Sequence, residues 1–553
     1  MKISTILFIS FILFFSFNFT KSQAQEDKKP LWDAYDESAE IQNQQSHANP
    51  RMRYQLIQSK FLDKNKVFQE LAPAVSAFSQ ERYQQLKPYI LEKDIPSIQQ
   101  AISEGIFTYE ELTLFYLKRI YNYELDKEKS LHTIIALNPN VLKEARERDK
   151  NKINNNYSVY GMPIVLKDNI DTKNMNTTAG AKVLEENTPL RDAFIVSQLK
   201  NKGALILGKV NLSEWAYYFC QGCPLGYSAI GGQTLNPYGR KQFETGGSSA
   251  GSGTATAANY AVAAVGTETA GSIISPSAQN SIVGLKPTIG ILSRTGIVPI
   301  SHTLDTPGPM TKNVVDNAIM LNAMVGKDKN DTSSILVSEN YIDAIKNASI
   351  KGKRLGVIKS LRSDSIYIET INKLKSAGAE IIEFTPPETS LDGFLTLLNL
   401  EMKEDLPKYL KKHASKNIQV SNLEEVMTFN KKDSVKYMPY NQNIFDGIMA
   451  DTTSTKAFRK IKKELYENGT AFFQEPIKEH NLDAILSINN YHSAEAAVGL
   501  HPCLTIPMGY KKNGEPIGLT LIASPLSEVT LYSIGASVEK ILNSRKMPDL
   551  FAH

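Results

Sequence analysis

Two glycine- and serine-rich turns lie in one continuous stretch, FETGGSSAGSGTATAANYAVAAVGTETAGSIISPS, which spans residues 243–277. The first turn, 245–253, is followed by TATAANYAVAAV, whose small side chains are typical of a close-packed helix and then a strand, and not of a flexible linker. The turn lacks the phosphate-binding patterns G-x-x-x-x-G-K-[ST] and, after a strand, G-x-G-x-x-G. Taken alone, it could be structural or catalytic.

The second turn, GTETAGSII at 266–274, directly follows the predicted strand. Small residues there let successive backbone N–H groups point into one space, which is what an oxyanion site needs. Ser272 stands at the end of this turn. It is therefore a candidate nucleophile, and the stretch 243–277 is the first place to look for chemistry.

A serine nucleophile needs a base, and two residues could provide one. His302 is a lone histidine with no evident orienting carboxylate in the sequence, which is more typical of a structural residue. Lys167 ends the apolar segment PIVLK, and burial there would lower its pKa and make a neutral amine available. For Lys167 considered by itself, a surface lysine is the simpler interpretation.

The rest of the chain alternates helical and strand patterns, which predicts an α/β sheet flanked by helices. Residues 95–105 and a second segment with Thr108 as N-cap are predicted helices. A strand, helix, strand pattern recurs at 353–384, and a last helix follows near the C-terminus. The predicted strands are 131–139, 161–171, 204–210, 353–359, 379–384, 483–488, 503–510 and 517–524. One large α/β domain over 91–545, preceded by a helical extension over 25–90, is the simplest division.

The N-terminus has the layout of a secretory signal. Lys2 precedes an apolar segment, 3–19, and Ser22-Gln23-Ala24 offers small residues at the two positions that a signal peptidase reads. We expect residues 1–24 to be a signal peptide and the mature protein to be periplasmic or secreted, without stable membrane insertion. An uncleaved membrane anchor is the alternative, because the apolar segment is only slightly shorter than a membrane span.

Composition and cysteine content narrow the class of protein further. A net charge of +4 over 553 residues, without a basic stripe, does not suggest a nucleic acid as partner. The three cysteines are Cys220, Cys223 and Cys503. No second C-x-x-C or H-x-x-x-H motif completes a four-ligand zinc site, so Cys220 and Cys223 are predicted loop residues that could form a local disulfide.

Four motifs together resemble the amidase signature family, in family order and over about residues 95–543. They are GMPIVLKDNID (161–171), TGGSSAGSG (245–253), GTETAGSIISPS (266–277) and VGLKPTIGILSRTGIVPISHTLDTPGPM (283–310). The resemblance implies a single α/β domain with a mixed, largely parallel twisted central sheet covered by helices. It also implies hydrolysis of amide bonds without a metal or another cofactor.

The resemblance assigns roles to individual residues. Lys167 matches the base, Ser272 the acylated nucleophile, and Ser248 the bridging serine, which follows a cis peptide bond from Gly247 in the family. Gly246 and Gly247 then belong to the supporting loop. The backbone N–H groups of Thr269, Ala270, Gly271 and Ser272 would stabilise the oxyanion.

Three positions depart from the commonest family pattern: Glu268, Ala270 and Ile274. Glu268 and Ile274 match a subgroup similar to bacterial peptide amidases, which also shares NLSEWA (211–216), whereas Ala270 departs even from that subgroup. The resemblance therefore implies an amidase acting on a small-molecule or peptide amide, with the C-terminal amide of peptides as one candidate. An amidotransferase amidase subunit and a non-catalytic binding protein on the same fold are the alternatives.

Overall fold

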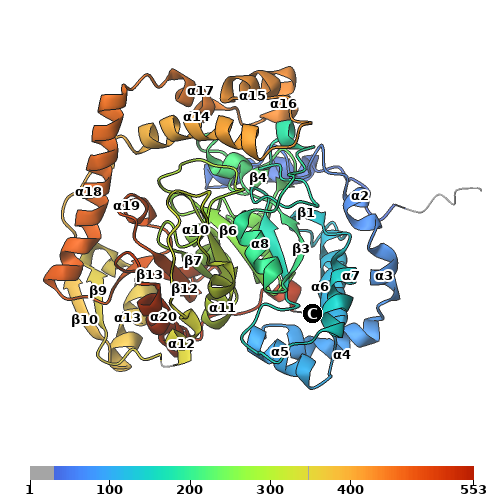
Figure 1. Ribbon diagram of the computed structural model, residues 1–553, viewed down its shortest axis with the longest axis horizontal. Helices are drawn as coiled ribbons and strands as arrows, with labels where there is room; N and C mark the ends of the chain where they lie inside the picture. The colour runs from blue at the N-terminus through green and yellow to red at the C-terminus, as the bar shows by residue number, and fades with distance from the viewer. Residues whose placement is uncertain (1–29, 347, 553) are drawn as a thin grey trace, which may run out of the picture.

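An eleven-stranded sheet runs through the part of the chain that the structure, a computed structural model, describes: residues 30–346 and 348–552 (Figure 1). The predicted signal peptide, 1–24, lies outside these residues. The strand order is β1-β3-β2-β6-β8-β7-β12-β13-β11-β9-β10. The strands are β1 Ile134–Leu137, β2 Pro163–Lys167, β3 Leu205–Val210, β6 Ala263–Glu268, β7 Val283–Lys286, β8 Thr306–Thr311, β9 Arg354–Ile358, β10 Glu380–Phe384, β11 Ala484–Ile488, β12 Cys503–Tyr510 and β13 Pro516–Ile522, while β4 Tyr227–Ser228 and β5 Gly232–Gln233 pair separately.

The sheet is mixed. Parallel pairing joins β3, β2 and β6 on one side and β11, β9 and β10 on the other, and the remaining neighbours are antiparallel. Every residue of β2 and β6 is buried, as expected for central strands covered on both faces. The predicted α/β class with one large domain is confirmed.

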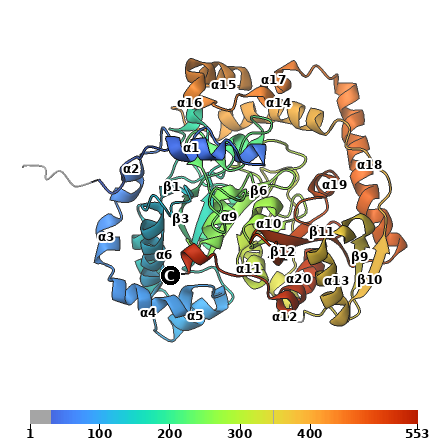
Figure 2. The same cartoon turned by 180° about the vertical axis from the view of Figure 1, so that it is seen from behind.

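Helices cover both faces of the sheet and extend beyond one end of it (Figures 1 and 2). Their bounds are α1 Ser38–Gln44, α2 Lys64–Gln69, α3 Ala72–Ala77, α4 Gln80–Ile90, α5 Ile95–Ser103, α6 Tyr109–Glu124, α7 Val141–Lys150, α8 Phe194–Asn201, α9 Ala250–Ala257, α10 Ile274–Gln279, α11 Val314–Met324, α12 Tyr341–Lys346, α13 Ser365–Ser376, α14 Phe394–Lys412, α15 Leu423–Asn430, α16 Ser434–Tyr437, α17 Asn443–Ala450, α18 Thr455–Glu479, α19 Ser493–Val498 and α20 Glu528–Leu542. Among the described residues, none of these helices is long and apolar enough to cross a membrane.

Local sequence signals set several of these boundaries. The Thr108 hydroxyl accepts from the backbone N–H of Glu111, and the Glu111 carboxylate accepts from that of Thr108, so α6 begins with a capping box. The predicted N-cap is therefore confirmed. The order of turn, α9, β6 and turn also agrees with the arrangement predicted from residues 243–277, and α10 follows the second turn without having been predicted.

Residues 30–90 carry the four helices α1–α4, which wrap around one side of the sheet (Figure 2). Met52, Ile57 and Phe68 from this segment are buried in the same hydrophobic core as the sheet. The segment is therefore packed as an integral part of the protein. The proposed division at residue 90 stays a prediction.

Helices α14–α18, residues 394–479, form a layer that the sequence patterns did not predict. In Figure 1, α14, α15, α16 and α17 lie across the top of the molecule, and α18 descends along one side. Apolar residues of α14, such as Leu397, Met402 and Leu406, pack with Trp215 and Phe219 in a second hydrophobic cluster. This helical cover therefore rests on the loops that follow the central strands.

Candidate active site

Lys167 ends β2 and is completely buried. Its Nζ lies 2.8 Å from the Ser248 Oγ, 2.8 Å from the Thr267 Oγ1 and 3.1 Å from the Thr267 carbonyl oxygen. Burial lowers the pKa of Lys167 to about 7, although the carboxylates of Asp305 and Glu268 oppose the shift. A large fraction of this amine is therefore neutral near neutral pH.

Ser248 is also completely buried, and the peptide bond between Gly247 and Ser248 is cis. Gly246 and Gly247 of this loop are tightly surrounded by neighbouring atoms. A Cβ atom on Gly247 would lie 2.6 Å from the Ser213 Oγ, and one on Gly246 would lie 2.7 Å from the Pro276 backbone. No side chain fits at either position without a shift of its neighbours.

The second turn brings Ser272 beside this loop. The Ser249 N–H donates to the Ser272 carbonyl oxygen at 3.1 Å, and Ser272 as a whole residue is partly exposed. Among the described residues, no hydrogen bond involves the Ser272 hydroxyl. The candidate nucleophile is thus partly accessible to solvent, whereas Lys167 and Ser248 are completely buried.

The backbone of the second turn leaves its N–H groups free. In the described part of the chain, the N–H groups of residues 269–272 donate to neither backbone nor side chains. The turn is closed by Glu268, whose Oε2 accepts from Ile273 N at 2.6 Å and Ile274 N at 2.9 Å. Unpaired N–H groups in a partly buried turn call for an acceptor, such as a developing oxyanion.

Asp305 supports the same turn, a role that the sequence patterns did not predict. Its Oδ1 accepts from the Thr269 hydroxyl at 2.6 Å, and its Oδ2 accepts from the N–H groups of Ile300 and Ser301, each at 2.8 Å. Burial raises the pKa of Asp305 to about 6. The only sequence signal for Asp305 is its position within the motif 283–310, three residues after His302.

The interpretation of His302 as a residue without an orienting carboxylate is wrong. Its Nδ1 lies 2.7 Å from Asp405 Oδ2 and its Nε2 lies 3.1 Å from Glu401 Oε1, both on α14. These carboxylates are about a hundred residues away in the sequence, so proximity along the chain could not reveal them. No hydrogen bond joins His302 to Ser248 or Ser272 among the described residues, so His302 connects the loop to the helical cover.

Cys220 and Cys223 are joined in a disulfide, whereas Cys503 is free and buried. The disulfide closes a short loop whose neighbours contact α17: Gln221 N donates to Asn443 Oδ1 and Ile444 N donates to the Phe219 carbonyl. The pair is therefore a local crosslink beneath the helical cover. No group of three or more possible metal ligands occurs in the described residues.

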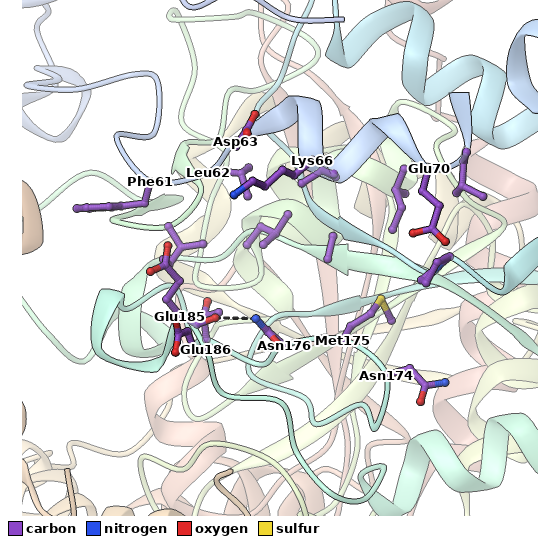
Figure 3. Close-up of a pocket in the computed structure, with 18 residues that line it drawn as sticks. Phe61, Leu62, Asp63, Lys66, Glu70, Asn174, Met175, Asn176, Glu185 and Glu186 are labelled. Carbon is purple, nitrogen blue, oxygen red and sulfur yellow. Dashed lines mark hydrogen bonds between the residues drawn. The ribbon is translucent and has the colours of Figure 1, made fainter. Parts of the chain in front are cut away.

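A separate cavity of about 600 Å³ lies between α2, the edge strand β1 and the loop 174–176 (Figure 3). Asn176 Nδ2 donates to the Glu185 carbonyl oxygen at 2.7 Å on its wall. None of Lys167, Ser248 and Ser272 lines this cavity. It is distinct from the cluster described above.

The family profile described as Amidase matches residues 111–497. The chain belongs to the amidase signature family. A probable amidase of Arabidopsis thaliana is 34% identical over 84% of this chain and 92% of that protein. One subunit of the glutamyl-tRNA(Gln) amidotransferase of Orientia tsutsugamushi is 30% identical over 82% of this chain and 99% of its own.

Two solved structures have the same fold. An amidase family protein from Bacillus anthracis gives a TM-score of 0.84 at 36% identity and covers 89% of this chain and 99% of its own. The peptide amidase from Stenotrophomonas maltophilia gives a TM-score of 0.78 at 33% identity, with coverage of 83% and 99%. The protein is therefore an amide-hydrolysing enzyme of this family, and the resemblance to bacterial peptide amidases is confirmed.

Proposed function

We propose that the protein is an exported serine amidase that hydrolyses a carboxamide to a carboxylic acid and ammonia, with Ser272, Ser248 and Lys167 as its catalytic triad. The observation that carries this proposal is the contact between the buried Lys167 Nζ and the Ser248 Oγ at 2.8 Å, next to a turn with free N–H groups that ends at Ser272. The likeness to the peptide amidase favours the C-terminal amide of a peptide as substrate.

The proposed mechanism uses these groups in the following order. Ser272 Oγ attacks the carbonyl carbon while its proton passes through the Ser248 hydroxyl to the neutral amine of Lys167. The oxyanion that forms accepts from the N–H groups of residues 269–272. The proton returns from Lys167 to the leaving nitrogen, ammonia departs, and an ester remains on Ser272. Water then attacks this ester by the reverse relay and releases the acid.

Export is part of the proposal. The predicted signal at 1–24 supports it, and the disulfide between Cys220 and Cys223 supports it independently, because disulfides persist mainly in oxidising compartments. We expect mature protein that begins near Gln25 in the periplasm or the culture medium. N-terminal sequencing of the native protein would check the cleavage; an intact N-terminus in the cytoplasmic fraction would contradict it.

An amidotransferase subunit is the second candidate, since the Orientia amidotransferase protein is a relative. The predicted export signal and the disulfide argue against it, because a tRNA-dependent reaction takes place in the reducing cytoplasm. Purification of the native protein distinguishes the two: stable co-purification with other subunits would favour the amidotransferase. The non-catalytic alternative has no support, because the chain belongs to a family of amide-hydrolysing enzymes.

The deciding experiment measures ammonia release by the purified mature protein from peptide amides, aliphatic amides and aryl amides. We expect the highest kcat/KM with peptide amides and labelling of Ser272 by a fluorophosphonate probe. Ser272→Ala should abolish turnover and labelling without loss of fold. Turnover retained by Ser272→Ala would refute the triad, and preference for another amide class would refute only the substrate.

A further inference from the structure

A second polar cavity, of about 710 Å³, lies at the other end of the strands that carry the active site. Glu268 of β6 pairs with Thr306 at the start of β8, whereas Ala263 pairs with Thr311 at its end. Lys312 follows Thr311 directly and lines the cavity. Its walls come from the start of α11, from α20 and from residues 543–547, which lie beside each other at the lower side of the molecule (Figure 1).

The charges around this cavity do not balance. It is lined by two acidic side chains and four basic ones: Glu92, Glu539, Lys312, Lys346, Lys540 and Arg545. Glu92 is already bound by Arg545, through two contacts of 2.8 Å, and by Asn259. Burial raises the pKa of Glu539 to about 8, which leaves this carboxyl mostly neutral at pH 7. Burial also lowers the pKa of Lys312, but Lys346, Lys540 and Arg545 keep the lining net positive even when Lys312 is neutral.

Among the basic residues that line the cavity, Lys312 is buried, at 3% exposure, and lacks a hydrogen-bond partner among the described residues. The nearest carboxylates are engaged elsewhere: Glu92 as above, and Asp316 by Ile95 N at 2.7 Å and Asn313 Nδ2 at 2.9 Å. A buried ammonium without an acceptor is costly, so a partner from outside the chain would stabilise it.

The first turn of the eleven-residue helix α11 adds a second unmet donor. Val314 N donates to the Glu539 carboxyl at 3.1 Å and Asp316 N donates to Asn313 Oδ1 at 2.8 Å. The N–H of Val315, which lines the cavity, has no acceptor in the described part of the chain. Free N–H groups at a helix N-terminus attract anions. Lys312 and Val315 thus present two donors at the same cavity.

We propose that this cavity binds a small molecule with a phosphate or carboxylate group, placed between Lys312 and the first turn of α11. Arg545 and Lys540 add positive charge around the anion. Ile506 and Pro507 form an apolar wall on which a short hydrocarbon part of the ligand rests. The site is separate from the triad, so the proposal does not depend on the substrate of the enzyme.

The test is the melting temperature of the full mature chain, titrated with inorganic phosphate at constant ionic strength and, in a second arm, with acetate. We expect a saturable rise with phosphate or acetate beyond that seen with sodium chloride, because a ligand that binds only the folded state stabilises it. The arm with the lower half-saturating concentration identifies the preferred anionic group.

Variants localise the effect. Lys312→Met should remove the ligand-dependent rise, and Lys312→Arg should restore it. Lys540 is exposed, so Lys540→Ala should fold normally and should raise the half-saturating concentration several-fold. This variant tests the site if Lys312→Met does not fold. Lys463→Met, on the distant α18, is the control and should behave as wild type. No saturable rise in either arm, or a rise that Lys540→Ala and Lys312→Met leave unchanged, would overturn the proposal.

Discussion

Lys167 shows how a single side chain acquires a function from its surroundings. A lysine in water is protonated up to about pH 10. Here enclosure at the end of β2 lowers its pKa to about 7, and three contacts hold its amine between Ser248 and Thr267. The same residue type on the surface would be an ordinary solvated cation.

The first prediction concerns the pH dependence that follows. A protonated Lys167 cannot accept the proton from Ser248, so kcat/KM should fall about tenfold per pH unit below about pH 7 and level off above it. The measurement is a kcat/KM profile from pH 5 to 9 on an uncharged amide, with circular dichroism to confirm folding at each pH. A profile that stays flat to pH 5 would exclude a lysine base.

Asp305→Asn provides the second prediction. The change weakens the support of Thr269 and should lower kcat by about tenfold to a hundredfold, as expected when a reacting geometry is disturbed, with little change in KM. It also removes a negative charge that raises the pKa of Lys167, so the acid limb should move to lower pH.

Asp364→Asn, which changes the N-cap of α13, is the matched control for this variant. It should affect stability alone. If both variants moved kcat and the pH profile equally, Asp305 would have no special role as a positioning residue.

The nucleophile turn is the element that links fold and chemistry. Gly271 has φ +90°, a backbone conformation that residues with a Cβ rarely adopt. A Cβ atom at this position would lie 3.1 Å from Asn490 Nδ2. Gly271→Ala should therefore shift the N–H groups on either side and reduce kcat about a hundredfold or more, as loss of one oxyanion donor does.

Gly352→Ala separates this effect from strain alone. Gly352 has φ +75° with open space around it and lies far from the turn in the sequence. Both variants should lose a similar amount of stability, measured by urea unfolding, but only Gly271→Ala should lose activity. Equal activities in the two variants would show that the geometry of the turn does not matter for turnover.

The sequence predicted those elements whose signals are local. The N-cap at Thr108, the apolar strand that contains Lys167 and the small residues of 245–253 can each be recognised from a few neighbouring positions. Other features depend on residues far apart in the chain. They are the direction in which neighbouring strands pair, the cover formed by α14–α18 and the contacts of His302. Amphipathic helices in 394–479 show which face is apolar, but not which surface they cover.

At the scale of the whole molecule, an ionic network links the helical cover to the loop 300–305 beside the nucleophile turn. Glu401 on α14 is completely buried and accepts hydrogen bonds from the Ser301 hydroxyl, from Thr303 and from Lys462 on α18, at 2.9 Å for the last. Ser301 belongs to the loop that Asp305 holds against the nucleophile turn. The network thus joins three segments that are distant in sequence.

Glu401→Ala tests how strongly this network contributes to stability. The variant leaves Lys462, whose side chain is 38% exposed, and the buried Ser301 hydroxyl without their shared acceptor. A buried polar group left without its hydrogen-bond partner costs about 1–3 kcal/mol. We expect a clear decrease in melting temperature and in the urea midpoint. Glu404→Ala on the same helix removes only an exposed pair with Lys408 and should change the free energy of unfolding by less than about 1 kcal/mol. If the two variants had the same melting temperature, the helical cover would be held by its apolar cluster alone. The network would then serve only to position the loop that carries Asp305.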